Sequence, residues 1–438
     1  MTETRPQARS GPLAVAQVDE TVTFLHLGGM SSTSDAVVII GAGHAGGTLA
    51  ALLRQYGHEG MITLLGEEPI APYQRPPLSK AWLKGEADAE SLALKPLEFY
   101  AESRIDFRPG VSAVSLDRAR RTVALSNGDT LGYHVAVIAT GMRPNRLAIE
   151  GADLGGVLTL RTAADAEALK ARLGTGKRLA IVGGGYIGLE VAASARALGA
   201  EVVVFEREAR ILARTACETL STFFQGYHAA RGVRFVLGAQ IAAFVGAGDQ
   251  VSGVRMVDGS VEAADVVLVG VGGRPNAEIA AAAGLKVERG VVVDMTARTG
   301  DEHVYAIGDA TSRPMPLYNR MFGPESVPSA LEQAKQAASA IVGRPAPAPE
   351  VPWNWSDQYD LKLQIAGLPF DADRILVRGD PATAHFAVFH LKGDLVQCVE
   401  AVNAAPEYMM GRQLIGNRKA VSTDRLADST VSMKEVAA

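Results

Sequence analysis

Two segments of the chain repeat one pattern of hydrophobic and polar positions. Each has an apolar run, a glycine-rich turn and then a helical pattern, and the segments are residues 37–57, VVIIGAGHAGGTLAALLRQYG, and residues 179–200, LAIVGGGYIGLEVAASARALGA. A further apolar run follows each segment and ends near Glu67 or near Glu208. This order predicts a buried strand, a helix and a second parallel strand. The chain therefore carries two β-α-β units.

A second pair of similar segments closes the two units. VAVIATGMRPN ends at Asn145, and VVLVGVGGRPN ends at Asn276. The simplest arrangement is an α/β fold with two nested, Rossmann-like dinucleotide-binding domains. The first domain then takes residues 35–145 and 271–345, and the second, inserted domain takes residues 146–270.

The pattern changes after Gly343. RPAPAPEVP reads as a proline-rich linker, and residues 351–425 alternate apolar and polar positions, as in FAVFHL, which predicts a C-terminal α+β domain with an antiparallel sheet. Residues 1–34, which lack the pattern of a signal peptide, and residues 426–438 are predicted to be flexible tails, and Met30 is a candidate translation start. The apolar stretch from residue 36 to 53 is interrupted by glycines, which argues against a membrane-spanning helix.

The first glycine-rich turn has the spacing of a dinucleotide site. Gly41, Gly43 and Gly46 follow a predicted strand and open a predicted helix, so the backbone can turn tightly and approach a pyrophosphate at the helix N-terminus. Glu67 ends the next strand, where an acid hydrogen-bonds the ribose of the adenosine half.

The second turn repeats this arrangement, so two dinucleotides are expected. Its glycines are Gly183, Gly185 and Gly188, and Glu206 ends the next strand. A carboxylate there accepts a hydrogen bond from a ribose 2′-hydroxyl and repels a 2′-phosphate, which favours NADH over NADPH. Arg207 and Arg210 leave the alternative open, because either arginine could hold a phosphate.

Composition argues against nucleic-acid binding, a disulfide framework and a metal site. The chain of 438 residues is long enough for two or three domains, its net charge is -5, and it has no run of lysine and arginine, so nucleic acid is not an expected partner. Cys217 and Cys398 are the two cysteines, far apart and without a CxxC motif, so neither a disulfide framework nor a metal site is expected and the cytoplasm is the natural setting.

Seven motifs in order resemble one known family. They are GAGHAG, PYQRPPLSKAWL, ATGMRP, GGGYIGLEVAA, YAIGDAT, ESVPSALEQA and WSDQYDLKLQIAGL. Over roughly residues 35–420 the chain resembles the FAD-dependent ferredoxin reductases of oxygenase systems, such as the putidaredoxin, rhodocoxin and biphenyl dioxygenase reductases. The resemblance implies a glutathione-reductase-like fold, FAD in the first domain, NADH in the inserted domain, and a C-terminal domain that covers the flavin.

The resemblance also implies residues for each nucleotide. The expected FAD-binding residues are Gly41, Gly43, Ala45, Gly46, Glu67, Arg75, Lys80, Ala113, Arg161, Asp309, Val327 and Trp355. The expected NADH-binding residues are Gly183, Gly185, Tyr186, Ile187, Gly188, Glu190, Glu206 and Gly272. Taken alone, Asp309 could be an ordinary turn residue, and Trp355 could be a buried core residue.

Lys80 and Glu190 are the expected catalytic residues. Two prolines stiffen the loop before Lys80, so its ammonium can be held beside a flavin, where a cation stabilises arriving electron density. The resemblance implies that Glu190, expected in the first turn of its helix, pairs with Lys80 and orients the nicotinamide. The alternatives are a surface lysine and an acid that favours the helix dipole.

The electron acceptor is expected to be a separate protein. The chain lacks the CxxxxC and CxxC motifs of disulfide-dependent flavoreductases, and a flavin can divide a hydride into single electrons, which suits an acidic [2Fe-2S] ferredoxin. A rubredoxin reductase, a signalling flavoprotein resembling apoptosis-inducing factor and an NADH oxidase remain alternatives. A monomer is expected, without a membrane.

Two departures from the family pattern concern the partner. Gly323 and Pro324 replace an arginine and an isoleucine, and residues 402–408, VNAAPEY, lack the usual arginine. The remaining candidate docking cations are Arg313, Arg320, Lys335 and Arg412.

Overall fold

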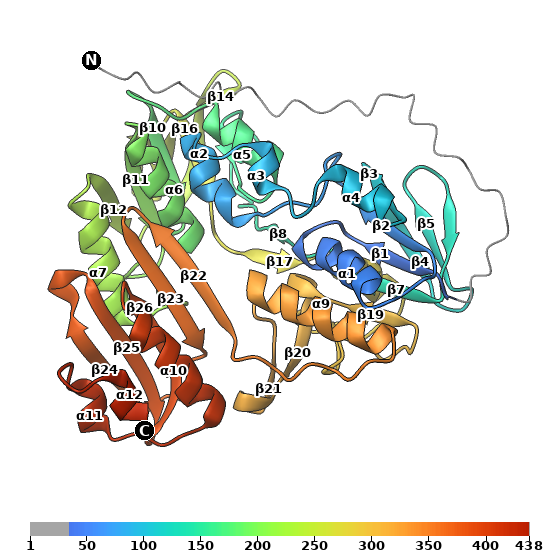
Figure 1. The fold of residues 1–438 in the computed structure, drawn as a ribbon. Coiled ribbons are helices and arrows are strands. Elements are labelled where there is room, and N and C mark those ends of the chain that lie inside the picture. The colour runs from blue at the N-terminus through green and yellow to red at the C-terminus, as the bar shows by residue number, and fades with distance from the viewer. Residues whose placement is uncertain (1–34, 438) are drawn as a thin grey trace, which may run out of the picture.

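The computed structural model describes residues 35–437 and is built around two five-stranded parallel sheets and one five-stranded antiparallel sheet (Figure 1). The first parallel sheet has the strand order β19-β7-β1-β2-β3. The strands are β1 (Val37–Ile40), β2 (Ile62–Gly66), β3 (Ile105–Pro109), β7 (Val135–Ile138) and β19 (Val304–Ala306). The short β19, from a segment far along the chain, completes the edge beside β7.

Strand β1 lies in the middle of this sheet and is buried along its whole length. It pairs in parallel with β2 and with β7, so that Val37 lies opposite Ile62 and Val135. Continuous apolar strands of this kind need cover on both faces. Helices α1 (His44–Gln55) and α9 (Val327–Ile341) pack against each other and supply alanine and leucine side chains to the core beneath them.

The second parallel sheet repeats the first around strand β10. Its order is β12-β11-β10-β16-β9, and β10 pairs in parallel with β11 and β16. The strands are β9 (Val157–Leu158), β10 (Arg178–Val182), β11 (Glu201–Glu206), β12 (Val233–Leu237) and β16 (Val266–Val269), and the main helices are α5 (Ala163–Lys170), α6 (Tyr186–Ala197) and α7 (Glu218–Ala229).

Small sheets and short helices fill the connections. The segments that close the two units pair with each other as β8 (Met142–Pro144) and β17 (Gly273–Pro275), so that Arg274 lies opposite Arg143. Two further sheets have three strands each: β4 (Ala113–Asp117), β5 (Thr122–Leu125) and β6 (Thr130–Gly132), and β13 (Ile241–Ala247), β14 (Gln250–Met256) and β15 (Val261–Ala263). A third small sheet joins β18 (Val291–Val292), β20 (Thr311–Met315) and β21 (Arg320–Phe322). The helices in this group are α3 (Ala89–Leu92), α4 (Leu97–Glu102) and α8 (Glu278–Ala282).

The C-terminal part is an antiparallel sheet covered by helices, as predicted. Its order is β22-β23-β26-β25-β24, with β22 (Trp353–Gln358), β23 (Leu361–Gly367), β24 (Arg374–Asp380), β25 (His385–Lys392) and β26 (Leu395–Val402). Helices α10 (Ala405–Asn417), α11 (Thr423–Ala427) and α12 (Met433–Ala437) follow. In Figure 1, β22 lies beside α6 of the second unit, and the two elements contact each other.

Two predictions about the chain ends have different outcomes. The prediction that residues 426–438 form a flexible tail is wrong for the described residues up to 437, because α12 packs against the C-terminal core. Its Met433 and Val436 are buried there, so even a short segment gains from packing its apolar face. The tail predicted for residues 1–34 lies outside the described residues. Among residues 35–437, no helix is long and apolar enough to cross a membrane.

Candidate functional site

The two glycine-rich turns have the same backbone geometry. Gly41 has φ +116° and Gly183 has φ +107°, values that L side chains rarely adopt. A Cβ at Gly41 would lie 2.3 Å from the carbonyl oxygen of Ala139, and a Cβ at Gly183 would lie 2.4 Å from that of Gly270. Both positions therefore require glycine, and for the same reason in each unit.

The N-terminus of each helix after these turns is open. Gly43 and Gly185 are the N-cap residues of α1 and α6, and no side chain caps either helix. A Cβ placed on either glycine would have no atom within 4 Å, so its backbone borders free space. Unpaired amides at an open helix N-terminus bind phosphate groups. The residues present therefore fit a dinucleotide at each of the two turns.

The acids predicted to bind the two riboses differ in position by one residue. In the second unit Phe205 pairs with Val182, and Glu206 follows directly, where its two carboxylate oxygens accept from the Gly184 and Glu208 amides at 2.8 and 2.9 Å. In the first unit the register places Gly66 at the equivalent position, because Leu65 pairs with Ile40. Glu67 comes one residue later and is exposed.

Arg207 and Arg210, the two arginines that could have bound the 2′-phosphate of NADPH, have other partners. Arg207 has a largely exposed side chain and pairs with Glu208 at 3.1 Å. Arg210 donates through Nη1 to the carbonyl oxygen of Ala216 at 2.9 Å and also bonds Ser221, so it holds the loop that follows β11. Neither arginine is paired with Glu206.

Predicted FAD residues from three segments meet at the start of α1. Arg161 Nη2 donates to Asp309 Oδ2 at 3.1 Å, and Asp309 lies in the short helix η3 (Gly308–Ala310). Burial lowers the pKa of His44, at the first position of α1, to about 4, and the charges of Arg75 and Arg161 add to this. These side chains form a charged cluster at the open end of the helix.

Glu325 faces the same cluster. Burial raises the pKa of its carboxyl, and repulsion from Asp309 adds to the shift. Sequence reasoning gave Glu325 no role, although it opens the ESVPSALEQA motif.

The loop before Lys80 is a short 3-10 helix, η2 (Pro76–Ser79), which continues into α2 (Ala81–Lys84). Its first two residues are prolines, whose fixed φ suits the start of a helical turn. Lys80 Nζ lies 2.6 Å from Glu190 Oε2 on α6, with exposed side-chain fractions of 18% and 6%. The predicted catalytic pair is therefore brought together. Glu190 was expected in the first turn of its helix but lies in the second turn, because α6 begins at Tyr186.

Two serines complete the surroundings of Glu190. Ser79 Oγ donates to Oε2 at 2.5 Å, and Ser356 Oγ, on strand β22, donates to Oε1 at 2.7 Å. Sequence reasoning missed both serines. The signals were present, because Ser79 lies in RPPLSK and Ser356 in WSDQ, yet nothing in the sequence indicated that these motifs meet.

The other predicted residues are spread around these clusters. Val327 is the first residue of α9, and Gly272, with φ +86°, precedes β17. Tyr186 and the exposed Ile187 are the first two residues of α6. The ring centroids of Trp355 and Trp353 lie 5.7 Å apart. Ala113 starts β4, in the separate three-stranded sheet.

The cysteines, far apart in the sequence, both belong to one core cluster between the second unit and the C-terminal sheet. Cys217, His390 and Glu400 are buried there with their ligand atoms within 4.8 Å of one another. The sequence argument against a thiolate metal site did not foresee that these three distant residues lie close together. His390 Nε2 lies 2.8 Å from Glu400 Oε2, and burial and Glu400 raise the pKa of Cys217 to about 12. Glu400 thus pairs with His390 and also lies close enough to Cys217 to raise the pKa of its thiol.

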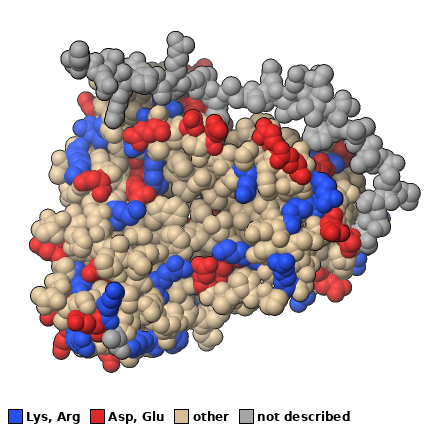
Figure 2. All heavy atoms as spheres, in the orientation of Figure 1, with Lys and Arg blue, Asp and Glu red and all other residues tan. Residues whose placement is uncertain are grey.

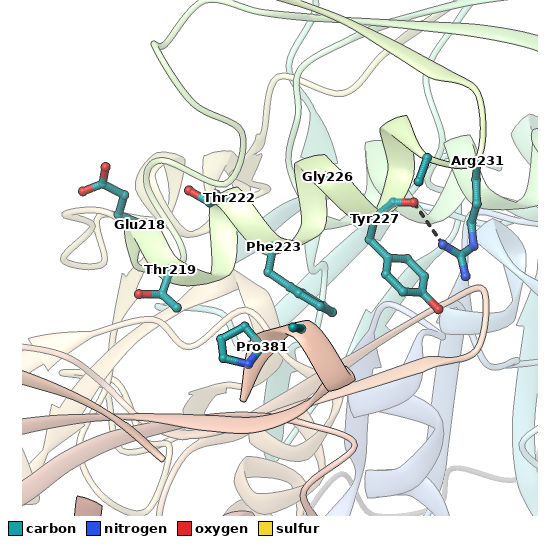
Figure 3. Close-up of a pocket in the computed structure, with 10 residues that line it drawn as sticks. Glu218, Thr219, Thr222, Phe223, Gly226, Tyr227, Arg231 and Pro381 are labelled. Atoms are coloured by element: carbon teal, nitrogen blue, oxygen red, sulfur yellow. Dashed lines mark hydrogen bonds between the residues drawn. The ribbon is translucent and has the colours of Figure 1, made fainter. Parts of the chain in front are cut away.

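A surface pocket of about 690 Å³ lies between α7 and the loop that follows β24 (Figure 3). The side chains of Phe223, Tyr227 and Pro381 line it, and Arg231 donates to the Tyr227 carbonyl oxygen at 3.2 Å. None of the predicted site residues lines this pocket.

The candidate docking cations differ in accessibility. Arg313 is 3% exposed and pairs with Glu332, so the prediction that it could contact a partner is wrong. Arg320 pairs with Asp371, and Lys335 and Arg412 both pair with Glu350, all at partly exposed positions. Figure 2 shows basic and acidic side chains interspersed over the face that it presents.

Comparisons with known proteins show which family the chain resembles. Residues 35–334 match the pyridine nucleotide-disulphide oxidoreductase family, and residues 353–437 match the reductase C-terminal family. A probable ferredoxin reductase from Castellaniella defragrans is 49% identical over 407 residues, which cover 93% of this chain and 100% of the relative. Putidaredoxin reductase from Pseudomonas putida is 40% identical over 412 residues, which cover 93% of this chain and 98% of the relative.

Solved structures extend the likeness to three dimensions. A covalent complex of putidaredoxin reductase with putidaredoxin matches with a TM-score of 0.90 at 40% identity, covering 92% of this chain and 98% of that chain.

Proposed function

Because the chain belongs to the pyridine nucleotide-disulphide oxidoreductase family and carries a reductase C-terminal domain, we propose that it is an FAD-dependent NADH:ferredoxin reductase of an oxygenase system. FAD held by this chain would supply the chemistry of accepting a hydride from NADH and releasing its two electrons singly to a [2Fe-2S] ferredoxin. The predictions of family, fold class, cofactors and enzyme class are confirmed.

The assignment of the site rests on the ion pair between Lys80 and Glu190. Lys80 follows a loop of the first nucleotide unit, and Glu190 belongs to the helix that starts at the glycine turn of the second unit. A pair at 2.6 Å that is mostly buried fixes the two units against each other at this point. Reaction by direct transfer depends on such positioning of two bound groups.

Each residue of the pair has its own proposed role. The ammonium of Lys80 would stabilise negative charge on a bound flavin, and Glu190 would keep that ammonium in place and orient the nicotinamide. Supporting this, the Lys80 side chain is restrained at further points, because Nζ also donates to the Pro76 carbonyl oxygen at 3.3 Å and to Ser79 Oγ at 3.5 Å.

FAD is proposed to lie in the first unit. Gly41, Gly43 and Gly46 would accommodate the pyrophosphate, and Arg161 and Asp309 would bind the chain between the flavin and the phosphates. The other FAD residues inferred from the resemblance remain proposals of the same kind. The charged cluster around His44 supports the assignment, since it faces the open N-terminus of α1.

NADH is proposed to lie in the second unit, with its adenosine ribose at Glu206. The carboxylate of Glu206 is fixed by two backbone amides, so it presents a negative charge where NADPH would bring a 2′-phosphate.

The electrons leave the chain because it has no redox-active dithiol. Cys217 and Cys398 are both free and buried in the core cluster, and the sequence has no other cysteine. Disulfide reduction by a cysteine pair beside the flavin is therefore not available, although the family name refers to it. A one-electron carrier protein is the acceptor.

The ferredoxin is proposed to be acidic and to meet partly exposed cations such as Arg320, Lys335 and Arg412. Gly323 cannot be replaced easily by the arginine of other family members, since a Cβ there would lie 2.5 Å from the Thr311 carbonyl oxygen. The partner is therefore expected to differ in its contacts here. A monomer in the cytoplasm is proposed, and the free thiols support a reducing compartment.

The test uses the purified protein with its flavin. NADH and NADPH oxidation are followed with ferricyanide, with a [2Fe-2S] ferredoxin coupled to cytochrome c, with rubredoxin, and with oxygen alone. Fast NADH-dependent cytochrome reduction that requires ferredoxin supports the proposal. Equal or better transfer to rubredoxin, or rapid consumption of oxygen without a protein acceptor, would overturn it in favour of a rubredoxin reductase or an NADH oxidase. Flavin reduction without transfer to any of these acceptors would favour a signalling flavoprotein.

A further inference from the structure

The C-terminal domain contributes a side chain to the pair that joins the two nucleotide units. Ser356 is the fourth residue of β22 and is 2% exposed. Its hydroxyl donates to Glu190 Oε1, whereas Ser79 and Lys80 both contact Oε2. The carboxylate is therefore held from both sides, and each of its oxygens has a partner from a different segment.

The hydrogen bonds beyond Ser356 all point in one direction. Ser356 has a single proton, which it donates to Glu190, so its oxygen accepts from Gln358 Nε2 at 3.0 Å. Gln358 Oε1 lies 2.7 Å from Nε2 of His228, a buried residue of α7. An amide oxygen is an acceptor, so Nε2 of His228 carries the proton. Each donor in this chain points toward the carboxylate of Glu190.

Such a chain suits orientation and not proton transport. Its middle member is the side-chain amide of Gln358, which does not exchange its protons readily between donor and acceptor roles. Successive hydrogen bonds that end on an ionised group strengthen one another and restrict the rotation of every member. A buried carboxylate also needs all of its lone pairs satisfied, because an unpaired oxygen there is costly.

We propose that Ser356, oriented by Gln358 and His228, is a positioning residue for hydride transfer. Its hydroxyl fixes Oε1 of Glu190, so that Oε2 stays on Lys80 and the position of the ammonium is fixed. The inference rests on the proposed function, in which Lys80 and Glu190 serve the flavin and the nicotinamide. The C-terminal domain thus takes part in the reductive half of the reaction and does more than cover the flavin.

The test measures flavin reduction by NADH in rapid-mixing experiments without oxygen, on the full-length holoprotein. Ser356→Ala is expected to lower the limiting rate of flavin reduction about 10- to 100-fold, because small errors of position have effects of this size. The concentration of NADH at half-saturation is expected to change by less than about twofold, since the nucleotide contacts remain. Ser356→Thr keeps the hydroxyl and is expected to recover most of the rate.

A matched control separates the hydroxyl from the general cost of changing a buried serine. Ser339 on α9 is 4% exposed, and Ser339→Ala is expected to leave the rate unchanged. If Ser356→Ala reduces its flavin at the wild-type rate, or if the threonine variant is as slow as the alanine variant, the proposal is overturned.

A double-mutant cycle tests whether Ser356 acts through Glu190. Combining Ser356→Ala with Glu190→Ala is expected to be no slower than Glu190→Ala alone, because without an acceptor at position 190 the hydroxyl of Ser356 has nothing left to hold. Additive losses would overturn the proposed route. Failure of the wild-type protein to reduce its flavin with NADH would instead overturn the proposed function.

Hydrogen–deuterium exchange supplies a readout that does not depend on activity. Amides of β22 and of residues 79–84 are expected to exchange faster in Ser356→Ala than in the wild type, both without NADH, and to stay unchanged in Ser339→Ala. Unchanged exchange at both segments would show that Ser356 does not hold them, which would also overturn the proposal.

Discussion

Lys80 Nζ and Glu190 Oε2 lie 2.6 Å apart, and this contact joins the loop of the first nucleotide unit to the helix of the second. The exposed side-chain fractions are 18% for Lys80 and 6% for Glu190. In such a setting the loss of one partner leaves the other as a poorly solvated charge. The pair is thus a structural link as well as the proposed centre of the chemistry.

Replacing Lys80 by methionine is expected to slow flavin reduction at least tenfold and to lower the free energy of unfolding by about 3 kcal/mol, since Glu190 would remain buried without its cation. Rapid mixing measures the first effect, and denaturant unfolding measures the second. Adding Glu190→Gln to Lys80→Met is expected to recover part of the stability but none of the rate. A stable Lys80→Met protein with normal flavin reduction would contradict both roles.

Asp309 gives a prediction about flavin retention. It accepts from Arg161 at 3.1 Å and lies near His44 at the start of α1. Asp309→Ala removes the carboxylate proposed to bind FAD, so the variant is expected to purify with less than half of its flavin. The ratio of flavin to protein absorbance measures this. Asp294→Ala, a change at an exposed turn, serves as the control and is expected to retain full flavin content.

Glu206 is expected to set the preference for NADH. A carboxylate near a 2′-phosphate costs several kcal/mol at an effective dielectric of about 20, so Glu206→Ala is expected to lower the NADH-to-NADPH ratio of kcat/KM by at least about tenfold. Steady-state assays with ferricyanide give the ratio for both nucleotides. The control is Glu208→Gln, because Glu208 is close in sequence but pairs with Arg207. An unchanged ratio in Glu206→Ala would show that another group discriminates.

The sequence predicted the two units because their turns obey local rules. Gly41 and Gly183 both need positive φ and both face a carbonyl oxygen, so the spacing of glycines is repeated wherever this turn is built. The pairing of Lys80 with Glu190 came from the resemblance, and the structure agrees in placing them together. Local rules were therefore sufficient for the glycine turns, whereas the ion pair needed the resemblance.

Features that depend on packing between distant segments were not predictable in this way. Ser356 meets Glu190 only because β22 packs on α6, and no periodicity in either segment indicates that contact. Glu67 was predicted one residue from the position equivalent to Glu206, because the end of a strand is fixed by its register with β1 and not by its composition. The helix α12 was missed because five residues carry too little periodicity to be recognised.

His228 gives a prediction about pH. Burial lowers its pKa to about 4, whereas an exposed histidine in the unfolded chain titrates near 6.5. Between these values the unfolded state binds more protons, so stability falls as the pH drops below about 6.5. His228→Gln keeps a donor for Gln358 and cannot titrate. The wild type is expected to lose about 2 kcal/mol more than this variant between pH 7 and pH 5, and equal losses in denaturant unfolding would contradict the assignment.

The two cysteines are expected to resist modification while the protein is folded. Thiol reagents attack the thiolate, and burial raises the pKa of Cys217 to about 12 and that of Cys398 well above its usual range. Their shared cluster also lies between the second unit and the C-terminal sheet, so access requires those parts to separate. At pH 8 a disulfide reagent should label neither cysteine in the native protein and both after unfolding, while an introduced surface cysteine, Ser432→Cys, should react at once. Rapid labelling of Cys217 without unfolding would mean that the C-terminal domain moves away from α7, and the hold of Ser356 on Glu190 would then be intermittent.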